Sequence, residues 1–221
     1  MAALNGSIYV ADQGGGAISR IDGYGNVLGL AGYVGGATGL TASTATGLLY
    51  ASGSAGLVSL NPTTGAVSVL ATGGFDGLSV SADGTELFAE DNQHVYGYTL
   101  STNAVVFDSG FIAGADGALV ANLAGTPVLF VNTNYGDIYE VALSDSTQTL
   151  IADSGSRGDI AALDTSNNTA IFSQSNTLVR LSLPAGSSFG VTAVPEPASL
   201  ALFGIGLFGI ARLRRARVNK A

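Results

Sequence analysis

Among the polar residues that stand directly before a glycine, four precede a segment of small and apolar residues. The pairs are Thr38-Gly39, Asp76-Gly77, Asp116-Gly117 and Arg157-Gly158. Two carboxylates, a hydroxyl and a guanidinium that met at one place could bind a cation or a small polar ligand. The alternative interpretation is that Asp-Gly simply suits tight turns. The four residues become a candidate ligand site only if the fold gathers their turns.

Few other residues could carry out catalysis. His94 is the only histidine, and in the turn Asp91–His94 we expect it to be a solvated loop residue. There is no cysteine, which excludes a thiol nucleophile, a disulfide and a cysteine-ligated zinc. No His-Glu-x-x-His segment, Walker loop or EF-hand loop is present. The oxygen-rich stretch 132–137 could hold calcium, although the turns of this chain are generally rich in such residues. We predict no cofactor and no catalytic residue.

A repeat of about forty residues runs through most of the chain. Five apolar segments each carry one aromatic residue at the matching place, and successive aromatic residues are 41, 38, 42 and 42 positions apart. They are Tyr9, Tyr50, Phe88, Phe130 and Phe172. Such even spacing is typical of a repeat architecture in which each unit packs on the next.

Each repeat contains strand-like segments separated by turns rich in Gly, Asn, Asp, Ser and Pro. In the second repeat these segments are residues 39–43, 48–51, 56–61 and 66–70. Four short strands in a repeat of this length are typical of a β-propeller blade, with the small-residue strand innermost. A β-sandwich also has many short strands, but it gives no reason for the recurring aromatic residue. We therefore predict an all-β propeller whose aromatic residues pack between blades.

About five four-stranded blades are visible, and Met1–Leu4 is the stub of the first inner strand. The last segment of the fifth blade, residues 189–194, runs directly into Pro195. The chain is therefore either a compact five-bladed ring or a larger ring that lost its beginning. We favour the second, because the carboxyl-terminal segment described below goes with a signal peptide, which the first residues do not show. In either ring, symmetry would bring four residues to one mouth of the central channel: Thr38, Asp76, Asp116 and Arg157.

The body, roughly residues 1 to 190, resembles propellers of the NHL, YVTN and SMP-30-like type. The resemblance rests on Gly6–Asp12 followed by Ile18–Gly23, and on Ser81–Phe88. Propellers of this kind serve as enzymes, sensors and scaffolds, so the fold alone does not decide the function.

The resemblance to SMP-30-like lactonases implies a divalent metal held in the channel by Glu, Asn and Asp side chains. The body has three glutamates, and none lies on a predicted inner strand. Asn122 and Asp159 lie on such strands but do not complete a metal site. A metal-dependent lactonase-like hydrolase is therefore the alternative to a non-enzymatic protein. The three glutamates are Glu86, Glu90 and Glu140.

The net charge of the chain changes sign at Val194. Residues before it include fifteen acidic and three basic side chains, with no lysine, for a net charge of 3 − 15 = −12. The residues after it carry five basic side chains and one acidic side chain, for a net charge of +4. A body this acidic argues against nucleic acid as a partner, because phosphates require a basic surface.

The carboxyl terminus has three parts in a fixed order. A linker, residues 191–197, contains Pro195, Glu196 and Pro197. The apolar segment 198–211 follows, and as a helix it would rise about 21 Å, short of a bilayer core of about 30 Å. Arginines directly after it could extend the span by reaching toward the interface. We predict a short transmembrane helix with a stop cluster of Arg212, Arg214, Arg215 and Arg217.

This terminus, residues 198–221 with the preceding Pro-Glu-Pro, resembles the PEP-CTERM sorting signal. The resemblance implies export through a signal peptide, recognition by an exosortase, and processing near Pro-Glu-Pro, in Gram-negative bacteria that make extracellular polysaccharide. The alternative is a simple tail anchor on a cytoplasmic protein. The Gly204-x-Gly206-x-x-Gly209 pattern does not indicate a dinucleotide site, because no acidic residue follows it.

From these features we expect an exported, surface-associated binding or structural protein. It would be anchored transiently in the inner membrane and then reach the cell surface, the outer envelope or the extracellular matrix. The expected partners are the exosortase, the membrane, and matrix components or extracellular polysaccharide.

Overall fold

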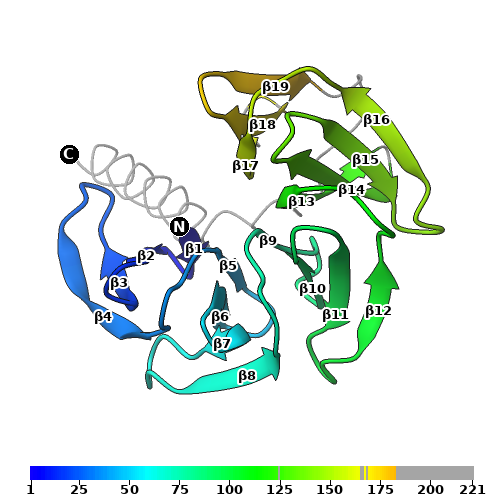
Figure 1. The fold of residues 1–221 in the computed structure, drawn as a ribbon. Helices are drawn as coiled ribbons and strands as arrows, with labels where there is room; N and C mark the ends of the chain where they lie inside the picture. Colours follow the sequence, from blue (N-terminus) through cyan, green and yellow to red (C-terminus); the bar gives the residue numbers. More distant parts are fainter. Residues whose placement is uncertain (124, 165–166, 168, 183–221) are drawn as a thin grey trace, which may run out of the picture. The chain divides into compact units, whose positions relative to one another are not determined.

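The computed structural model describes residues 1–123, 125–164, 167 and 169–182. The chain divides into two units, Met1–Gly190 and Val191–Ala221, and every described strand belongs to the first. In that unit the strands form five antiparallel sheets that follow one another along the chain (Figure 1). The prediction of an all-β propeller with about five visible blades is thereby confirmed, while the preference for a larger ring stays a prediction.

Each sheet is a blade whose strands follow in sequence order from the centre outward (Figure 1). Blade 1 consists of β1 (Ala2–Leu4), β2 (Ser7–Ala11), β3 (Ala17–Ile21) and β4 (Val27–Tyr33). Blade 2 consists of β5 (Leu40–Ser43), β6 (Leu48–Gly53), β7 (Gly56–Leu60) and β8 (Val67–Ala71). Blade 3 consists of β9 (Leu78–Val80), β10 (Glu86–Glu90), β11 (Val95–Thr99) and β12 (Val105–Asp108). Blade 4 consists of β13 (Ala115–Leu123), β14 (Thr126–Thr133), β15 (Ile138–Ala142) and β16 (Gln148–Ala152).

Blade 5 has three described strands, β17 (Gly158–Asp164), β18 (Thr169–Gln174) and β19 (Leu178–Ser182). The fourth strand predicted at residues 189–194 lies outside the described residues. The predicted stub at Met1–Leu4 is present as β1, which pairs with β2 in register Ala3 opposite Ile8.

The recurring aromatic residues are buried, as the repeat predicted. Their exposed fractions lie between 0 and 6 %. Tyr50 of blade 2 packs with Leu87 and Ala89 of blade 3, and Phe88 of blade 3 packs with Leu129 of blade 4. Each second strand therefore contributes an apolar side chain to the core between blades. The outermost strands lack such a neighbour and expose both faces, so they hold side chains such as Val69 and Val105 in solvent.

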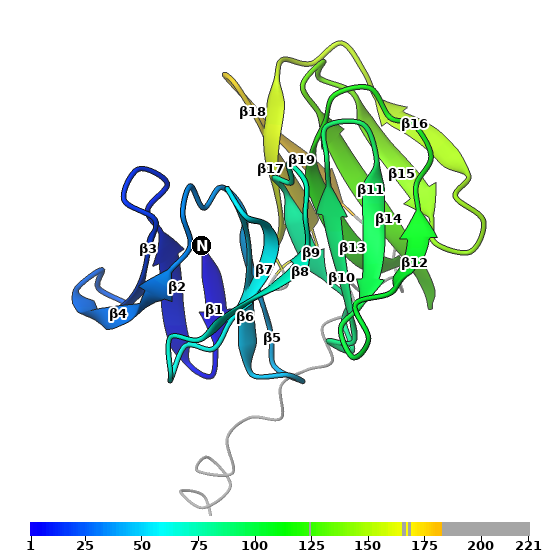
Figure 2. The ribbon, with the colours of Figure 1, turned by 60° about the horizontal axis from the view of Figure 1, so that its bottom comes forward.

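Inner strands pack on one another from β1 to β5, β9, β13 and β17, and Figure 2 shows β9, β10 and β13 side by side. Among the described residues, no strand of blade 5 makes a comparable contact with blade 1. The small residues of the inner strands permit this close packing around the channel.

No helix long and apolar enough to cross a bilayer occurs in the part of the chain that the structure describes. The predicted helix at residues 198–211 and the arginine cluster after it lie outside that part.

Candidate ligand site at the channel mouth

The loops that lead into the inner strands meet at one end of the channel. A cavity of about 260 Å³ lies there between blades 3, 4 and 5. Its lining includes three of the four residues predicted to meet at the mouth, Asp76, Asp116 and Arg157. Their neighbours in the lining are Gly74, Phe75, Glu90, Asp91, Asn92 and Asn134.

Glycines after the predicted site residues allow this convergence. A Cβ on Gly39 would overlap the carbonyl oxygen of Asp76, and one on Gly77 would lie 2.8 Å from that of Asp116. A Cβ on Gly117 would likewise overlap the carbonyl oxygen of Asp159. These glycines therefore let the next blade's backbone approach, and none of the three has the positive φ that a tight turn would require of glycine.

Three carboxyl groups gather at the cavity. Asp76, Glu90 and Asp116 each offer an oxygen atom, and these oxygens lie within 4.8 Å of one another. Glu90 is 1 % exposed and Asp116 is 5 % exposed. The backbone N–H of Gly77 donates to Glu90 Oε1 at 2.6 Å, and that of Asn92 donates to Oε2 at 2.7 Å. These bonds hold the Glu90 carboxyl group against the mouth.

Burial makes the charged forms of these groups costly. Burial raises the pKa of Glu90 to about 8, and the nearby Asp76 and Asp116 add to the increase. The two hydrogen bonds that Glu90 accepts from backbone N–H groups lower the pKa, but they do not offset the effect of burial. The pKa of Asp76 is raised by burial despite a hydrogen bond from Thr38. The pKa of Asp116 is raised by burial and by repulsion from Asp76. The cluster therefore retains protons that ordinary carboxyl groups lose.

Arg157 provides the single positive charge in the lining of this cavity. Its Nε donates to Asn134 Oδ1 at 2.7 Å, and a terminal nitrogen lies 3.5 Å from Asp116 Oδ2. Asn134 Nδ2 in turn donates to Asn92 Oδ1 at 3.2 Å. Because the Arg157 side chain is 67 % exposed, it neutralises the buried carboxyl groups only in part.

Thr38 lies beside the cavity rather than in its lining. Its hydroxyl is 3.0 Å from that of Ser52. It lines the adjoining channel of about 200 Å³, together with Asp76, Asp116 and Asp159. The four predicted residues therefore share the mouth, while their role toward a ligand stays a prediction.

Glu90 was not among the residues predicted for this site, because it lies on a second strand. It stands two residues after Phe88, so strand alternation places both side chains on the face toward the next blade. The residues at the same offset in blades 2, 4 and 5 are also buried and polar: Ser52, Asn132 and Gln174. Several of them bond across the interface, as when Asn132 Nδ2 donates to Ser173 O at 2.8 Å. A polar residue two positions after the recurring aromatic residue was therefore the feature of the sequence that could have identified Glu90.

His94 differs from the expected solvated loop residue. Its Nδ1 lies 2.8 Å from Asp108 Oδ1, and its ring stacks on Tyr96 with centroids 5.5 Å apart. The stretch Gly186–Gly190 has the Gly-x-Ser-x-Gly spacing of hydrolase nucleophile turns. It lies outside the described residues.

The stretch 132–137 does not gather its oxygens. Asn132 points across the interface to blade 5, and Asn134 is engaged by Arg157. Carboxylate oxygens are the donors that hard cations such as Ca²⁺ prefer, and the Asp76, Glu90 and Asp116 set fits such an ion better. The set includes a glutamate, Glu90, although none lies on an inner strand.

Comparisons with known proteins address the two units separately. Residues 193–215 match the family model described as the PEP-CTERM protein-sorting motif. The carboxyl terminus is therefore a PEP-CTERM sorting motif, which implies export, cell-surface sorting and processing by exosortase. Pro195, Glu196 and Pro197 fall within the match, as do Arg212, Arg214 and Arg215, whereas Arg217 lies beyond it.

The body matches solved propellers in fold alone. A structure of a nidogen/laminin complex aligns with a TM-score of 0.68 and 9 % identity, over 85 % of this chain and 76 % of that one. A gluconolactonase from Xanthomonas campestris aligns with a TM-score of 0.64 and 16 % identity, over 80 % of this chain and 69 % of that one. The search of curated proteins found no match. The body is thus a five-bladed β-propeller similar to nidogen and to an SMP-30-like gluconolactonase.

Proposed function

We propose that this protein is a non-enzymatic binding module of the cell surface or extracellular matrix, whose propeller holds a hard cation or a small cationic ligand at the channel mouth. The sorting motif supports delivery to the outside. In the delivery step, the apolar segment 198–211 and the arginines after it would hold the precursor in the inner membrane for the exosortase.

One observation carries the ligand proposal. Two carboxyl groups that are almost fully buried, those of Glu90 and Asp116, face a cavity with only one exposed guanidinium nearby. Strongly perturbed groups of this kind are costly to stability and concentrate at functional sites. A bound cation would offset this cost, because it would displace the proton that Glu90 retains and pair with the carboxylates instead. Asp76, Glu90 and Asp116 would hold it.

Titration calorimetry with CaCl₂ at pH 7 tests this proposal. We expect binding accompanied by proton release, so the observed heat should differ between buffers with different ionisation enthalpies. Asp116→Asn should weaken binding at least tenfold. The matched control is Asp145→Asn, because Asp145 is exposed and caps a distant turn that asparagine can also cap. Binding that is absent, or that is equal in the wild type and Asp116→Asn, would contradict the proposed site.

The alternative function is a metal-dependent lactonase-like hydrolase. The similarity to a gluconolactonase and the carboxyl cluster at the mouth favour it. An assay with gluconolactone in the presence of Ca²⁺ or Zn²⁺ separates the two functions. We expect no turnover above background. Hydrolysis that Asp116→Asn abolishes, while Asp145→Asn retains it, would instead establish the enzyme.

A further inference from the structure

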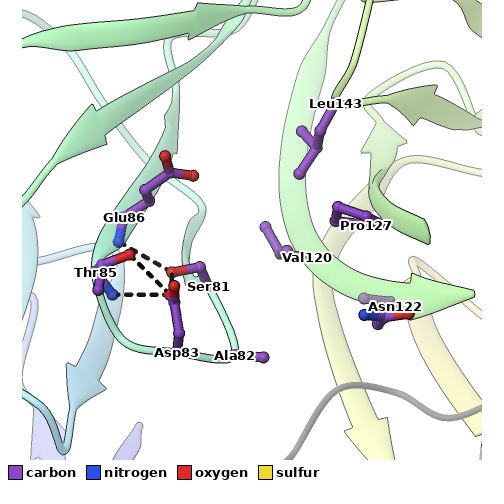
Figure 3. Close-up of a pocket in the computed structure, with 10 residues that line it drawn as sticks. Ser81, Ala82, Asp83, Thr85, Glu86, Val120, Asn122, Pro127 and Leu143 are labelled. Carbon is purple, nitrogen blue, oxygen red and sulfur yellow. Dashed lines mark hydrogen bonds between the residues drawn. The ribbon is translucent and has the colours of Figure 1, made fainter. Parts of the chain in front are cut away.

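A second and larger cavity lies between blades 3 and 4 (Figure 3). It has a volume of about 370 Å³, within the range of about 300–1,000 Å³ typical of ligand pockets. The mouth site lies where β9 and β13 begin, whereas this cavity lies where they end, next to Ser81 and Asn122. The two cavities therefore occupy opposite ends of the same interface.

The neighbouring interface, between blades 2 and 3, is packed differently at this end. There the turn after β9 contacts blade 2, where Ser43 Oγ donates to Gly84 O at 2.9 Å. Toward blade 4 the turn meets a longer hairpin, since β13 has nine residues whereas β9 has three. The extension of β13 beyond the end of β9 leaves one side of the hairpin uncovered.

The two walls of this cavity differ in chemistry, as Figure 3 shows. The blade 3 wall is acidic and hydroxylated, with Asp83 and Glu86. The blade 4 wall is mainly apolar, with Val120, Pro127 and Leu143. No basic side chain lines the cavity.

The side chains of Asp83 and Glu86 differ in their hydrogen bonds. Asp83 Oδ1 accepts hydrogen bonds from the Ser81 hydroxyl at 2.6 Å and from the Thr85 hydroxyl at 2.8 Å. The Ser81 bond, followed by those from Thr85, lowers the pKa of Asp83, so it is charged at neutral pH. The Glu86 carboxylate has no hydrogen bond or ion pair with any described residue, although the residue is half-buried. It is free to bind a ligand.

We propose that this cavity binds a small aliphatic amine. Its ammonium group would pair with the Glu86 carboxylate near Asp83, and its hydrocarbon part would lie against Val120, Pro127 and Leu143. Two carboxylates without a basic neighbour repel an anion and favour a cation. An inorganic cation would leave the apolar wall unused, whereas an alkylammonium ion uses both walls. This inference does not depend on the mouth site.

The test is an NMR titration of the full chain with n-pentylamine, and with n-pentanol as a neutral probe of similar size. We expect pentylamine to shift the amide signals of residues 81–86 and 120–127, and pentanol to bind at least tenfold more weakly. Glu86→Gln should weaken pentylamine binding about tenfold. Val120→Thr, which keeps the shape but adds a hydroxyl to the apolar wall, should weaken binding of both probes.

Asp153→Asn is the matched control, because Asp153 is exposed and lies outside the cavity, and it should bind pentylamine like the wild type. Circular dichroism checks that each variant is folded. Equal binding of pentanol and pentylamine would overturn the proposal, as would an unchanged affinity in folded Glu86→Gln. Shifts confined to the mouth residues would also overturn it, and would assign the amine to the other site.

Discussion

At the scale of single residues, Glu90 is the most informative side chain. It is almost fully buried, yet each of its oxygens accepts a backbone N–H. Blades 2, 4 and 5 place a neutral polar residue at the same offset from the aromatic residue, such as Ser52 or Asn132, and blade 1 has Ala11 there. The repeat therefore does not require an ionisable side chain at this position. The carboxyl group of Glu90 makes this blade sensitive to pH.

We expect the stability of the fold to fall as the pH rises from 5 to 8.5. The pKa of Glu90 is raised to about 8 in the fold, from 4.5 in a free side chain. Folding thus favours the protonated form, and this contribution is complete below about pH 4.5 and is lost as the pH rises through about 8. The raised pKa values of Asp76 and Asp116 act in the same direction. Thermal unfolding by circular dichroism in the presence of a chelator would measure a Tm lower by several degrees at pH 8.5.

Glu90→Gln should flatten this pH dependence, because the amide keeps one acceptor oxygen but cannot ionise. A wild-type Tm that stays constant or rises between pH 5 and 8.5 would contradict the assignment. If Tm depends on pH as steeply in Glu90→Gln as in the wild type, other groups cause the effect.

At the scale of elements, the interfaces between inner strands depend on glycine. Gly39, Gly77 and Gly117 each face a carbonyl oxygen of the next blade at a distance that excludes a side chain. The residue before each glycine is carried to the mouth because the backbones approach so closely. The same feature thus serves both packing and the candidate site.

We expect Gly117→Ala to destabilise the propeller by about 1–3 kcal/mol, because the added methyl group must displace the backbone of Asp159. Urea unfolding measures the change. The matched control is Gly23→Ala, since a Cβ at Gly23 meets nothing within 4 Å and its φ is not positive. The control should stay within about 0.5 kcal/mol of the wild type. Similar losses in the two variants would show that the close approach does not limit the fold.

At the scale of the whole molecule, the acidic propeller and the sorting motif have separate tasks. The motif at residues 193–215 concerns delivery, and both cavities lie on the propeller. The described residues that line these cavities all belong to the propeller, so we expect cleavage of the tail to leave them in place. Binding should therefore survive processing.

We expect Pro195→Ala to block processing when the chain is expressed behind a signal peptide in an exosortase-positive host. In a pulse-chase experiment, the wild type should lose its tail and leave the membrane fraction, while the variant should persist there as the larger form. Pro62→Ala, in the turn between β7 and β8 and outside the motif, serves as the control. If Pro195→Ala is processed like the wild type, the role assigned to Pro-Glu-Pro is wrong.

The blade pattern and the sorting motif could be predicted from the sequence because both depend on local order along the chain. Side-chain alternation, turn residues and an even spacing of Tyr50, Phe88 and Phe130 are enough to specify strands that pack as repeats. The position of Asp76 and Asp116 at one mouth followed from the same symmetry.

Other features depended on contacts between blades, which only the tertiary structure decided. Glu90 joins Asp76 and Asp116 because β10 faces blade 4, and His94 meets Asp108 because β11 pairs with β12. The cavity beside Glu86 exists because β13 extends beyond its neighbour. Distances of this kind arise from strand register and from packing between blades, where residues far apart in the chain meet. Composition and spacing alone do not determine them.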